Sequence, residues 1–583
     1  MKQKIVRAIA TVMMIIGLLG VFPLGTSQAA SQTPKGPKPK FSENVAFDVS
    51  PTLRDLAARR IVPEVSTGND EEEVRPEPGP EAVDTGFTGD NVVQTTSEPF
   101  GLTISSPLIS FEGISNQDNF NIFGGRVNPP DPVGDVGPNH YVEMVNLAFS
   151  VYDKSGNLLL GPVDTGTLWD GFVIQDCTDP SGDPIVLYDQ FADRWLLSQF
   201  TTRGLDDPTL PFYNCVAISQ TGDPTGAYYR YAFRTQPDTV DGGYFFPDYP
   251  KYGVWKDSYI MTTRDFGLID QYGISVYALE KNKMINGQAK ARAVQFFLDS
   301  NDVPLEQIGD GLLPADIDGK TKPKNDAPAP IVGTQDDGAG YGATFDALNI
   351  WELRVQWNAR PDASLTGPIQ LPTEPFDSIF PCAPTSRDCL PQPGITNRTQ
   401  YLDILSYRQR PTHRLAYRNF GTYETFVTNQ SVEAAPGVAG VRWYEVRRVN
   451  GTYSIYQQGT YAPGDGVHRW MGSAAMDWQG NLALGYSVVN GVDVYPGIRY
   501  TGRMAGDTLG QMTLGEGVIM NGSGVQTTTN SRWGDYTSLN IDPVDDCTFW
   551  YVNEYYTASG QASSAAGWQT RIGSFKIPGC YPK

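Results

Sequence analysis

The chain has 583 residues, a formal net charge of −21 and 40% hydrophobic residues. The acidic balance argues against a nucleic-acid-binding role, because phosphate binding needs clusters of lysine and arginine, and the sequence has no such cluster. The excess of carboxylates suits solubility outside a cell and leaves oxygen ligands for hard cations, so Ca²⁺ is a candidate cofactor.

The beginning of the chain predicts a secretory signal peptide. Three cations lie among the first seven residues, an apolar run follows over residues 8–21, and the small-residue string SQAA at 27–30 resembles a cleavage site. We expect a signal peptide over residues 1–30, cleaved after Ala29 or Ala30. A membrane anchor is the alternative, but the apolar run is shorter than the roughly 20 residues of a spanning helix. We therefore expect a bacterial protein that is secreted, extracellular or held at the cell surface, with no integral membrane segment after signal removal.

Residues 31–100 form a second segment of distinct composition. The string SQTPKGPKPK from Ser31 is rich in proline and lysine, and NDEEEVRPEPGPE from Asn69 is an acidic run. Both contain too little apolar surface to offset the entropy of ordering. We expect a disordered tether or a propeptide, with one short helix at 53–61.

Residues 101–583 have the composition of an all-β domain. Short runs rich in valine, isoleucine and aromatic residues alternate with glycine, proline, aspartate and asparagine, which is typical of strands and turns. A domain of roughly 480 residues is large for a single β-sandwich, so internal repetition is expected.

A diverged repeat runs through this domain. Each copy has a polar turn, an apolar strand, a second turn and an aromatic-rich strand. The copies begin near Gly134, Gly182, Tyr249, Leu312, His413, Met471 and Arg532. Such units stack radially because none can bury both of its faces alone. We expect a single β-propeller with seven blades; six or eight blades, or a pair of stacked β-sandwiches, are the alternatives.

The cysteine content predicts disulfide bonds. All six cysteines lie after the signal peptide, and an even number in an exported chain is typical of a disulfide framework. The simplest pairing joins sequence neighbours: Cys177 with Cys215, Cys382 with Cys389, and Cys547 with Cys580. Because the chain has three histidines, we do not expect a histidine-rich transition-metal site.

Several strings resemble known proteins. They are PPDPVGDVGPNHYVEMVN from Pro129, LLPADIDG from Leu312, YRNFGTYETFVTN from Tyr417, SAAMDWQGNLALGYS from Ser473 and RWGDYTSLNIDPVDDCTFWYVNEYY from Arg532. As a set they resemble a functionally uncharacterised family of secreted bacterial β-propeller-like proteins. The resemblance implies fold and secretion and supplies no catalytic residue.

A looser similarity to sialidase-type propellers rests on the string AMDWQGNL at 475–482. It lacks the serine, threonine and tryptophan of the Asp-box turn of those proteins. Asp477 is then expected to bond backbone amides before Gly480 as a turn residue.

In propellers, ligands meet the polar loops at one mouth of the central channel. Several such loops carry charged residues: Asp131, Asp135, Asp183, Asp248, Asp316, Asp318, Arg418, Glu424, Arg532 and Asp535. The string RWGDY at 532–536 is the most site-like, and we expect ligand binding by Arg532, Trp533 and Asp535, because arginine clamps carboxylates and tryptophan stacks on sugars. The alternative is that Arg532 pairs with Asp535 while Trp533 packs in the core.

Two pairs of aspartates are candidate metal ligands. Asp316 and Asp318 alternate before Gly319, a spacing shared with short Ca²⁺ loops, and Asp131 and Asp135 form the second pair. The acids that would complete an EF-type loop do not follow Gly319. An ordinary turn stabilised by the aspartate side chain is the alternative.

Three functions remain open from the sequence. The first is a monomeric secreted or cell-surface propeller that binds an extracellular glycan or protein ligand. The second is a carbohydrate-active hydrolase or lyase, whose catalytic candidates are Arg418, Glu424, Arg499, Arg532, Asp535 and Tyr536. The third is a structural surface domain. Convergence of the three arginines within about 6 Å of a shared pocket with a carboxylate would favour the enzyme.

Overall fold

The computed structural model describes residues 37–59, 86–87, 89–97, 99, 101–235, 245–267, 271–382, 387–404 and 409–582. The expected signal peptide and the acidic run at 69–81 lie outside these residues. The described part of the chain is all-β, as predicted. Its short helices are α1 (Leu53–Arg59), α2 (Asn116–Phe123), α3 (Arg203–Asp206), α4 (Lys281–Ile285), α5 (Ala558–Ser563), η1 (Thr165–Trp169), η2 (Gln175–Thr178), η3 (Leu305–Gln307) and η4 (Arg398–Gln400).

The first three sheets are built mainly from consecutive antiparallel strands. One contains β5 (Val133–Val136), β6 (His140–Val145), β7 (Ala148–Asp153) and β8 (Leu158–Asp164). The next contains β9 (Ile185–Asp189), β10 (Arg194–Phe200), β11 (Tyr213–Ser219) and β12 (Ala227–Arg234), with β2 (Ala46–Thr52) at its edge. The third contains β13 (Phe245–Val254), β14 (Ser258–Gly267), β15 (Tyr272–Glu280) and β16 (Arg292–Asp299), with β1 (Lys40–Glu43) at its edge.

The following sheet has nine strands, because two groups join through the parallel pairing of β17 with β21. The groups are β17 (Leu313–Ile317), β18 (Ala329–Gln335), β19 (Ala347–Gln356) and β20 (Asp362–Pro372), then β21 (Thr412–Asn419), β22 (Glu424–Ala435), β23 (Val438–Val449) and β24 (Thr452–Tyr461), with β3 (Val93–Gln94). The last two sheets are β25 (His468–Met476), β26 (Leu482–Val489), β27 (Gly497–Arg503) and β28 (Glu516–Met520), and β29 (Ser538–Ile541), β30 (Thr548–Tyr556), β31 (Trp568–Lys576) and β4 (Ile109–Ser115).

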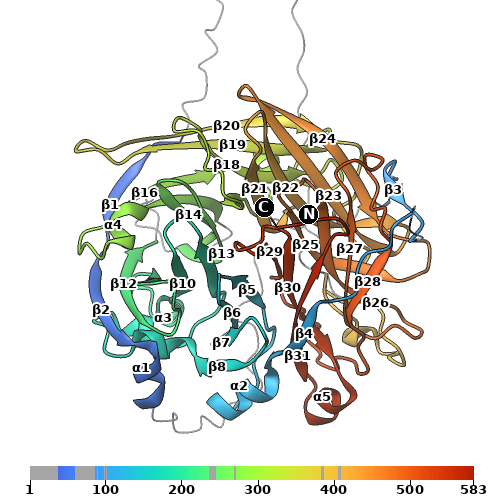
Figure 1. Ribbon diagram of the computed structural model, residues 1–583, viewed down its shortest axis with the longest axis horizontal. Helices are drawn as coiled ribbons and strands as arrows, with labels where there is room; N and C mark the ends of the chain where they lie inside the picture. Colours follow the sequence, from blue (N-terminus) through green and yellow to red (C-terminus); the bar gives the residue numbers. More distant parts are fainter. Residues whose placement is uncertain are drawn as a thin grey trace, which may run out of the picture. The chain divides into compact units, whose positions relative to one another are not determined.

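The first strands of successive groups contact one another. These contacts join β5 to β9, β9 to β13, β13 to β17, β17 to β21, β21 to β25, and β25 to β29, and β29 contacts β5. In Figure 1, β5, β13 and β29 lie near the centre, and their sheets extend outward from it. The loops that precede the first strands therefore meet.

Apolar side chains fill the space between neighbouring sheets. Val142, Leu196 and Tyr259 belong to one buried cluster that spans the sheets of β6, β10 and β14. Ile260 and Trp351 belong to a second cluster that spans the sheets of β14 and β19. Each sheet thus buries its two faces against two neighbours, which is the physical reason that these units pack together.

Part of the segment that we expected to be a disordered tether is ordered at the edges of sheets. β1 pairs with β16, β2 pairs with β12, and β3 lies parallel to β24; β1 and β2 run along the outside of their sheets in Figure 1. Helix α1 occupies most of the predicted helix at 53–61. Residues 37–59 of the segment that we expected to be disordered are therefore ordered. An edge strand needs few buried side chains, so a polar composition did not prevent pairing.

The disulfides join the predicted neighbours. Cys177 bonds to Cys215 and ties η2 to β11, Cys382 bonds to Cys389 within a loop, and Cys547 bonds to Cys580 near the end of the described chain. Across the ranges that the structure describes, no helix combines the length and the apolar character needed to cross a membrane.

Candidate functional site

Three residues in or just before the first strands β5, β9 and β13 share a backbone conformation. Asp131, Asp183 and Tyr249 have φ angles of 48°, 50° and 52°, and a proline follows each of them. Residues other than glycine adopt this left-handed conformation at a cost, and it persists where the surrounding structure holds it, often at functional sites. The shared conformation lies just before β5 and β9 and within β13, at the register irregularity of that strand.

Hydrogen bonds tie these loops to the loop before β29. The backbone N–H of Asp535 donates to Oδ1 of Asp131 at 2.8 Å. Asn146 donates through Nδ2 to Oδ2 of Asp131 at 3.1 Å, and its Oδ1 accepts the N–H of Asp183 at 2.9 Å. Three sheets are therefore joined through buried polar groups, and the carboxylates are held in place from more than one side.

Tyr536 bridges two of the loops. Its phenolic oxygen lies 3.0 Å from Oδ2 of Asp183 and 3.0 Å from the carbonyl oxygen of Pro250, so its single proton has two acceptors. Burial, and then the charge of Asp183, raise the pKa of Tyr536 well above its usual value. The phenol therefore remains protonated and acts as a hydrogen-bond donor.

Lys251 lies beneath this bridge. A register irregularity between Asp248 and Lys251 interrupts the pairing of β13 with β14. The ammonium nitrogen lies 2.9 Å from the ring centroid of Tyr536 and 3.3 Å from that of Tyr249. It has no hydrogen-bond partner among the described residues. Burial lowers the pKa of Lys251 well below its usual value, and the charge of Asp183 opposes this shift only in part.

Two arginines complete the surroundings of Asp535. Arg532 donates through Nη2 to Oδ2 of Asp535 at 3.1 Å, and Nη2 of Arg410 lies 3.8 Å from the same oxygen. The guanidinium of Arg410 also lies over the ring of Tyr249 at 4.0 Å. Asp535 is thereby engaged by two cations. The carboxylates of Asp183 and Asp248 lie closer to solvent.

We call the following set the central cluster: Asp131, Asp183, Asp248, Lys251, Asp535 and Tyr536. Asp183 and Asp248 are half-buried, whereas the other four are buried, so these two carboxylates form its solvent-facing side. Burial and the charge of Asp248 raise the pKa of Asp183. Burial and the charge of Asp535 raise the pKa of Asp131 to about 7. A carboxyl with such a pKa can either donate or accept a hydrogen bond at neutral pH.

The structure brings together five of the residues singled out in the sequence, namely Asp131, Asp183, Asp248, Asp535 and Tyr536. Of the other catalytic candidates, Arg532 pairs with Asp535, whereas the remaining three lie in separate ion pairs. Arg418 binds Asp546 at 2.7 Å, Arg499 binds Glu516 at 2.8 Å, and Glu424 accepts two hydrogen bonds from Arg448 at 2.7 Å. The convergence of Arg418, Arg499 and Arg532 that would have favoured an enzyme is therefore not observed, because each guanidinium pairs with a different carboxylate.

Trp533 packs in the core instead of facing a ligand. It is 2% exposed, its ring centroid lies 5.1 Å from that of Trp470, and its indole N–H donates to Oγ of Ser487 at 3.2 Å. Arg532, beside it, pairs with Asp535. The alternative interpretation of the RWGDY string, an internal ion pair beside a core tryptophan, describes this geometry.

The predicted metal pairs have other partners. Arg414 donates to Oδ2 of Asp316 at 2.9 Å and to Oδ1 of Asp318 at 2.6 Å, so a guanidinium lies where the cation was expected. Asp135 accepts the N–H of Tyr188 at 2.6 Å. Burial and the charge of Asp316 raise the pKa of Asp135 to about 8. Asp135 is thus close to Asp316 rather than acting with Asp131.

The predicted role of Asp477 is confirmed. Its Oδ1 accepts the N–H groups of Gln479 and Asn481 at 2.9 Å each, and its carbonyl accepts the N–H of Gly480 at 3.1 Å. Gly480 has a φ of 87°, which glycine adopts without strain. Asp477 therefore stabilises the turn between β25 and β26.

Sequence reasoning did not single out Lys251 or Arg410. A usable signal was the string DYPK at 248–251. Its third residue is proline, as in PDPV at 130–133 and GDPI at 182–185. Aligning the three strings would have placed Lys251 at the start of an inner strand, next to the aspartates of the neighbouring loops.

A further acidic group lies outside the central cluster. Carboxylate oxygens of Asp336, Asp337 and Asp346 lie within 4.8 Å of one another. Asp336 accepts the N–H groups of Gly338 and Ser378, each at 2.6 Å, and Asp346 accepts those of Asp337 and Phe376. These bonds account for the grouping as stabilisation of backbone turns.

Comparisons with known proteins identify no family. No protein-family model matches the sequence, and no curated protein sequence matches it. Among solved structures, the chain is similar to an α-L-arabinanase of Penicillium chrysogenum complexed with arabinobiose, with 10% identity, 66% of this chain and 91% of that chain covered, and a TM-score of 0.31. It is also similar to an α-L-arabinofuranosidase of Fusarium graminearum, with 9% identity, 68% and 92% covered, and a TM-score of 0.30. Likenesses at these TM-scores carry no argument about this chain.

Proposed function

We propose that this protein is an exported, seven-bladed β-propeller that binds an extracellular glycan at the central cluster. The observation that carries the proposal is the pairing of two half-buried carboxylates, Asp183 and Asp248, with the fully buried Lys251 and Tyr536. Carboxylates accept hydrogen bonds from sugar hydroxyls, and a few convergent polar groups on a rigid scaffold are what a specific binding site needs.

The fold and the compartment in this proposal have separate support. The contacts from β5 through each first strand to β29, and from β29 to β5, are those expected of seven groups of strands around one axis. The pairing of β4 with β31 completes the last sheet with an early strand. Three disulfides are typical of proteins that act in an oxidising compartment.

A carbohydrate-active hydrolase is the second candidate, and the pKa of Asp131 favours it. Glycosidases need one carboxyl that remains protonated near neutral pH and a second that acts as a nucleophile or a base. The raised pKa of Asp131 fits the acid in such a reaction. In this candidate function, Asp183 acts from the solvent-facing side.

A glycan array and a polysaccharide hydrolysis screen, both run on the mature protein, test the two candidates together. We expect binding to at least one glycan, reduced about tenfold or more in Asp183→Asn and Asp248→Asn. Asp362→Asn changes an exposed carboxylate at the start of β20 and is the matched control. Binding without products supports the binding function, and products that disappear in Asp183→Asn support the hydrolase. Neither binding nor products with any glycan would overturn both.

A further inference from the structure

A cavity lies between two sheets, near the end of β13 that is remote from the central cluster. Its lining comes from the turn between β13 and β14, the loop before β18, and the end of β19. Lys251 and Trp255 are four residues apart on or just after β13, which corresponds to about 13 Å along an extended chain. The cavity is therefore distinct from the central cluster.

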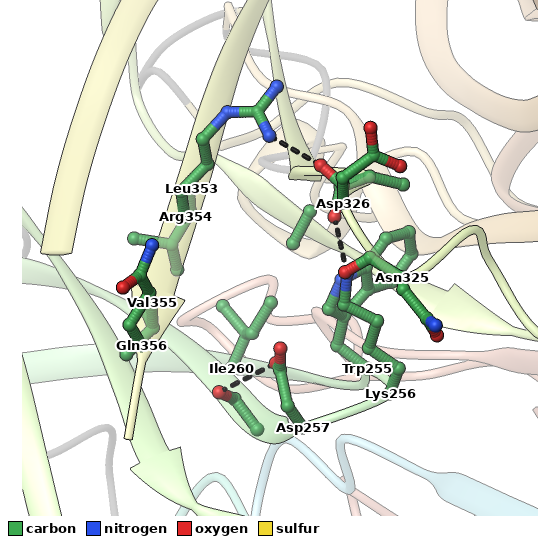
Figure 2. A pocket seen from close by; sticks show the side chains of 13 residues that line it. Trp255, Lys256, Asp257, Ile260, Asn325, Asp326, Leu353, Arg354, Val355 and Gln356 are labelled. Carbon is green, nitrogen blue, oxygen red and sulfur yellow. Dashed lines mark hydrogen bonds between the residues drawn. The ribbon is translucent and has the colours of Figure 1, made fainter. Parts of the chain in front are cut away.

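The cavity has an apolar floor and a polar rim (Figure 2). Its volume is about 170 Å³. The buried side chains of Trp255, Ile260 and Leu353 form the apolar part. Figure 2 shows Asp257 on one side and Arg354 with Asp326 on the opposite side. The volume is below the roughly 300 Å³ at which pockets for drug-sized ligands begin, so the space suits one small ring.

The ammonium group of Lys256 holds one wall of the cavity through three hydrogen bonds. Lys256 donates to the carbonyl oxygens of Lys324 at 3.1 Å and Ala327 at 2.9 Å, and also to that of Asn325. Arg354 donates to the carbonyl oxygen of Asp326 in the same loop. The loop is therefore fastened to β19 and to the turn after β13, and the three donors of Lys256 are used within the protein.

Asp257 is the partly buried carboxylate of the lining, whereas Asp326 is exposed. Oδ1 of Asp257 accepts a hydrogen bond from Oγ of Ser258 at 3.1 Å. Within the described ranges, no lysine or arginine forms an ion pair with it. Burial raises the pKa of Asp257, although Lys256 lowers it in part. A partly buried carboxyl in this state gains free energy from a hydroxyl donor in the cavity.

We propose that this cavity binds one uncharged sugar ring through Asp257, Gln356 and the apolar floor. Charges of both signs line the cavity, and the ammonium of Lys256 is already saturated, so neither an anion nor a cation is favoured. A single sugar ring combines hydroxyl groups at its rim with an apolar C–H face. The hydroxyl groups match Asp257 and the exposed amide of Gln356. The C–H face matches Trp255 and Leu353. The proposal does not depend on the function of the central cluster.

Titrations of the full mature protein test this site with defined probes. The probes are D-glucose, D-galactose, D-mannose, L-arabinose and N-acetyl-D-glucosamine, with glycine and glutamate as charged comparators, followed by saturation-transfer NMR and calorimetry. We expect at least one sugar to bind. Asp257→Ala weakens its affinity about tenfold, and Gln356→Ala weakens it about threefold. Asp362→Asn and Asp183→Asn leave the affinity unchanged.

Each remaining result has a defined meaning. Binding of no sugar, or binding of glycine or glutamate in place of sugars, overturns the proposal. Sugar binding that survives Asp257→Ala and disappears in Asp183→Asn also overturns it, while supporting the proposed function of the central cluster. Because Gln356 is exposed on β19, the Gln356→Ala variant decides the question even where Asp257→Ala does not fold.

Discussion

The phenolic oxygen of Tyr536 lies 3.0 Å from Oδ2 of Asp183, although 353 positions separate the two residues in the sequence. The bond joins the loop before β29 to the loop before β9. Because β5 lies between these two strands in the order of contacts, the bond spans the place where three sheets begin. One hydrogen bond thus connects a half-buried carboxylate with the fully buried part of the central cluster.

Removing this bond should lower stability by a measurable amount. In Tyr536→Phe we expect the free energy of unfolding to fall by about 1–3 kcal/mol, because buried acceptors lose their hydrogen-bond donor. Tyr213→Phe is the control, since the half-buried phenol of Tyr213 has no side-chain hydrogen bond within the described residues. Equal stability of the two variants in urea denaturation would contradict the role assigned to Tyr536.

Glu143 should make stability depend on pH. It is fully buried, accepts the N–H of Ile114 at 2.9 Å, and burial raises its pKa from 4.5 to about 8. Between these values the folded state holds a proton that the unfolded state releases, so stability falls as pH rises, by up to about 1.4 kcal/mol per pH unit. Below pH 4.5 both states are protonated, and this contribution is fully present.

Glu143→Gln removes the titrating group and keeps the shape of the side chain. We expect the slope of unfolding free energy against pH to become less negative between about pH 5 and 8, while Glu374→Gln, at an exposed position, leaves the slope unchanged. Denaturant titrations at unit steps of pH measure this slope. Parallel curves for the wild type and Glu143→Gln would refute the prediction.

The three disulfides should differ in their contributions. The Cys177–Cys215 bond closes a sequence separation of 38, and the Cys382–Cys389 bond closes a separation of 7. From chain entropy we expect a loss of about 4 kcal/mol when the first pair is replaced by alanine and about 2.5 kcal/mol for the second. Thermal unfolding of the two double variants compares them directly, and the reverse order would show that the entropy of the unfolded chain does not set the difference.

Arg414 should be more important for stability than an ion pair at the surface. In Asp318→Asn, the buried guanidinium loses a carboxylate that lies 2.6 Å away, and we expect a cost of about 3–5 kcal/mol. The exposed pair of Lys290 and Glu43, 3.7 Å apart, is the control, and Lys290→Ala should cost less than about 1 kcal/mol. Similar losses in the two variants would show that Arg414 is not a central structural contact.

Much of the fold could be predicted from the sequence, because local patterns produce it. The string SAAMDWQGNLALGYS forms the end of β25, a turn at Asp477, and β26, as the alternation of apolar runs and turn residues indicates. The pairing of the cysteines also followed from sequence order. These features depend on contacts between residues that are near one another in the chain.

The central cluster could be predicted only in part, because it depends on which loops meet in space. Asp183 and Asp248 stood out as acids in polar loops, whereas Lys251 lies within a strand and did not stand out. Its burial results from Tyr249 of its own strand and Tyr536 of a distant loop. β1 was missed for a different reason: it pairs through its backbone with β16 and needs few apolar side chains.

The pairing of β4 with β31 affects how the protein can mature. β4 ends at Ser115, and its partner β31 begins at Trp568, close to the end of the chain. Because synthesis starts at the N terminus, β4 is made long before its partner strand β31. A chain truncated before residue 568 therefore exposes an unpaired strand edge that chaperones and proteases recognise. Arrival of the final strand removes that edge, so the same pairing distinguishes a finished molecule from an unfinished one.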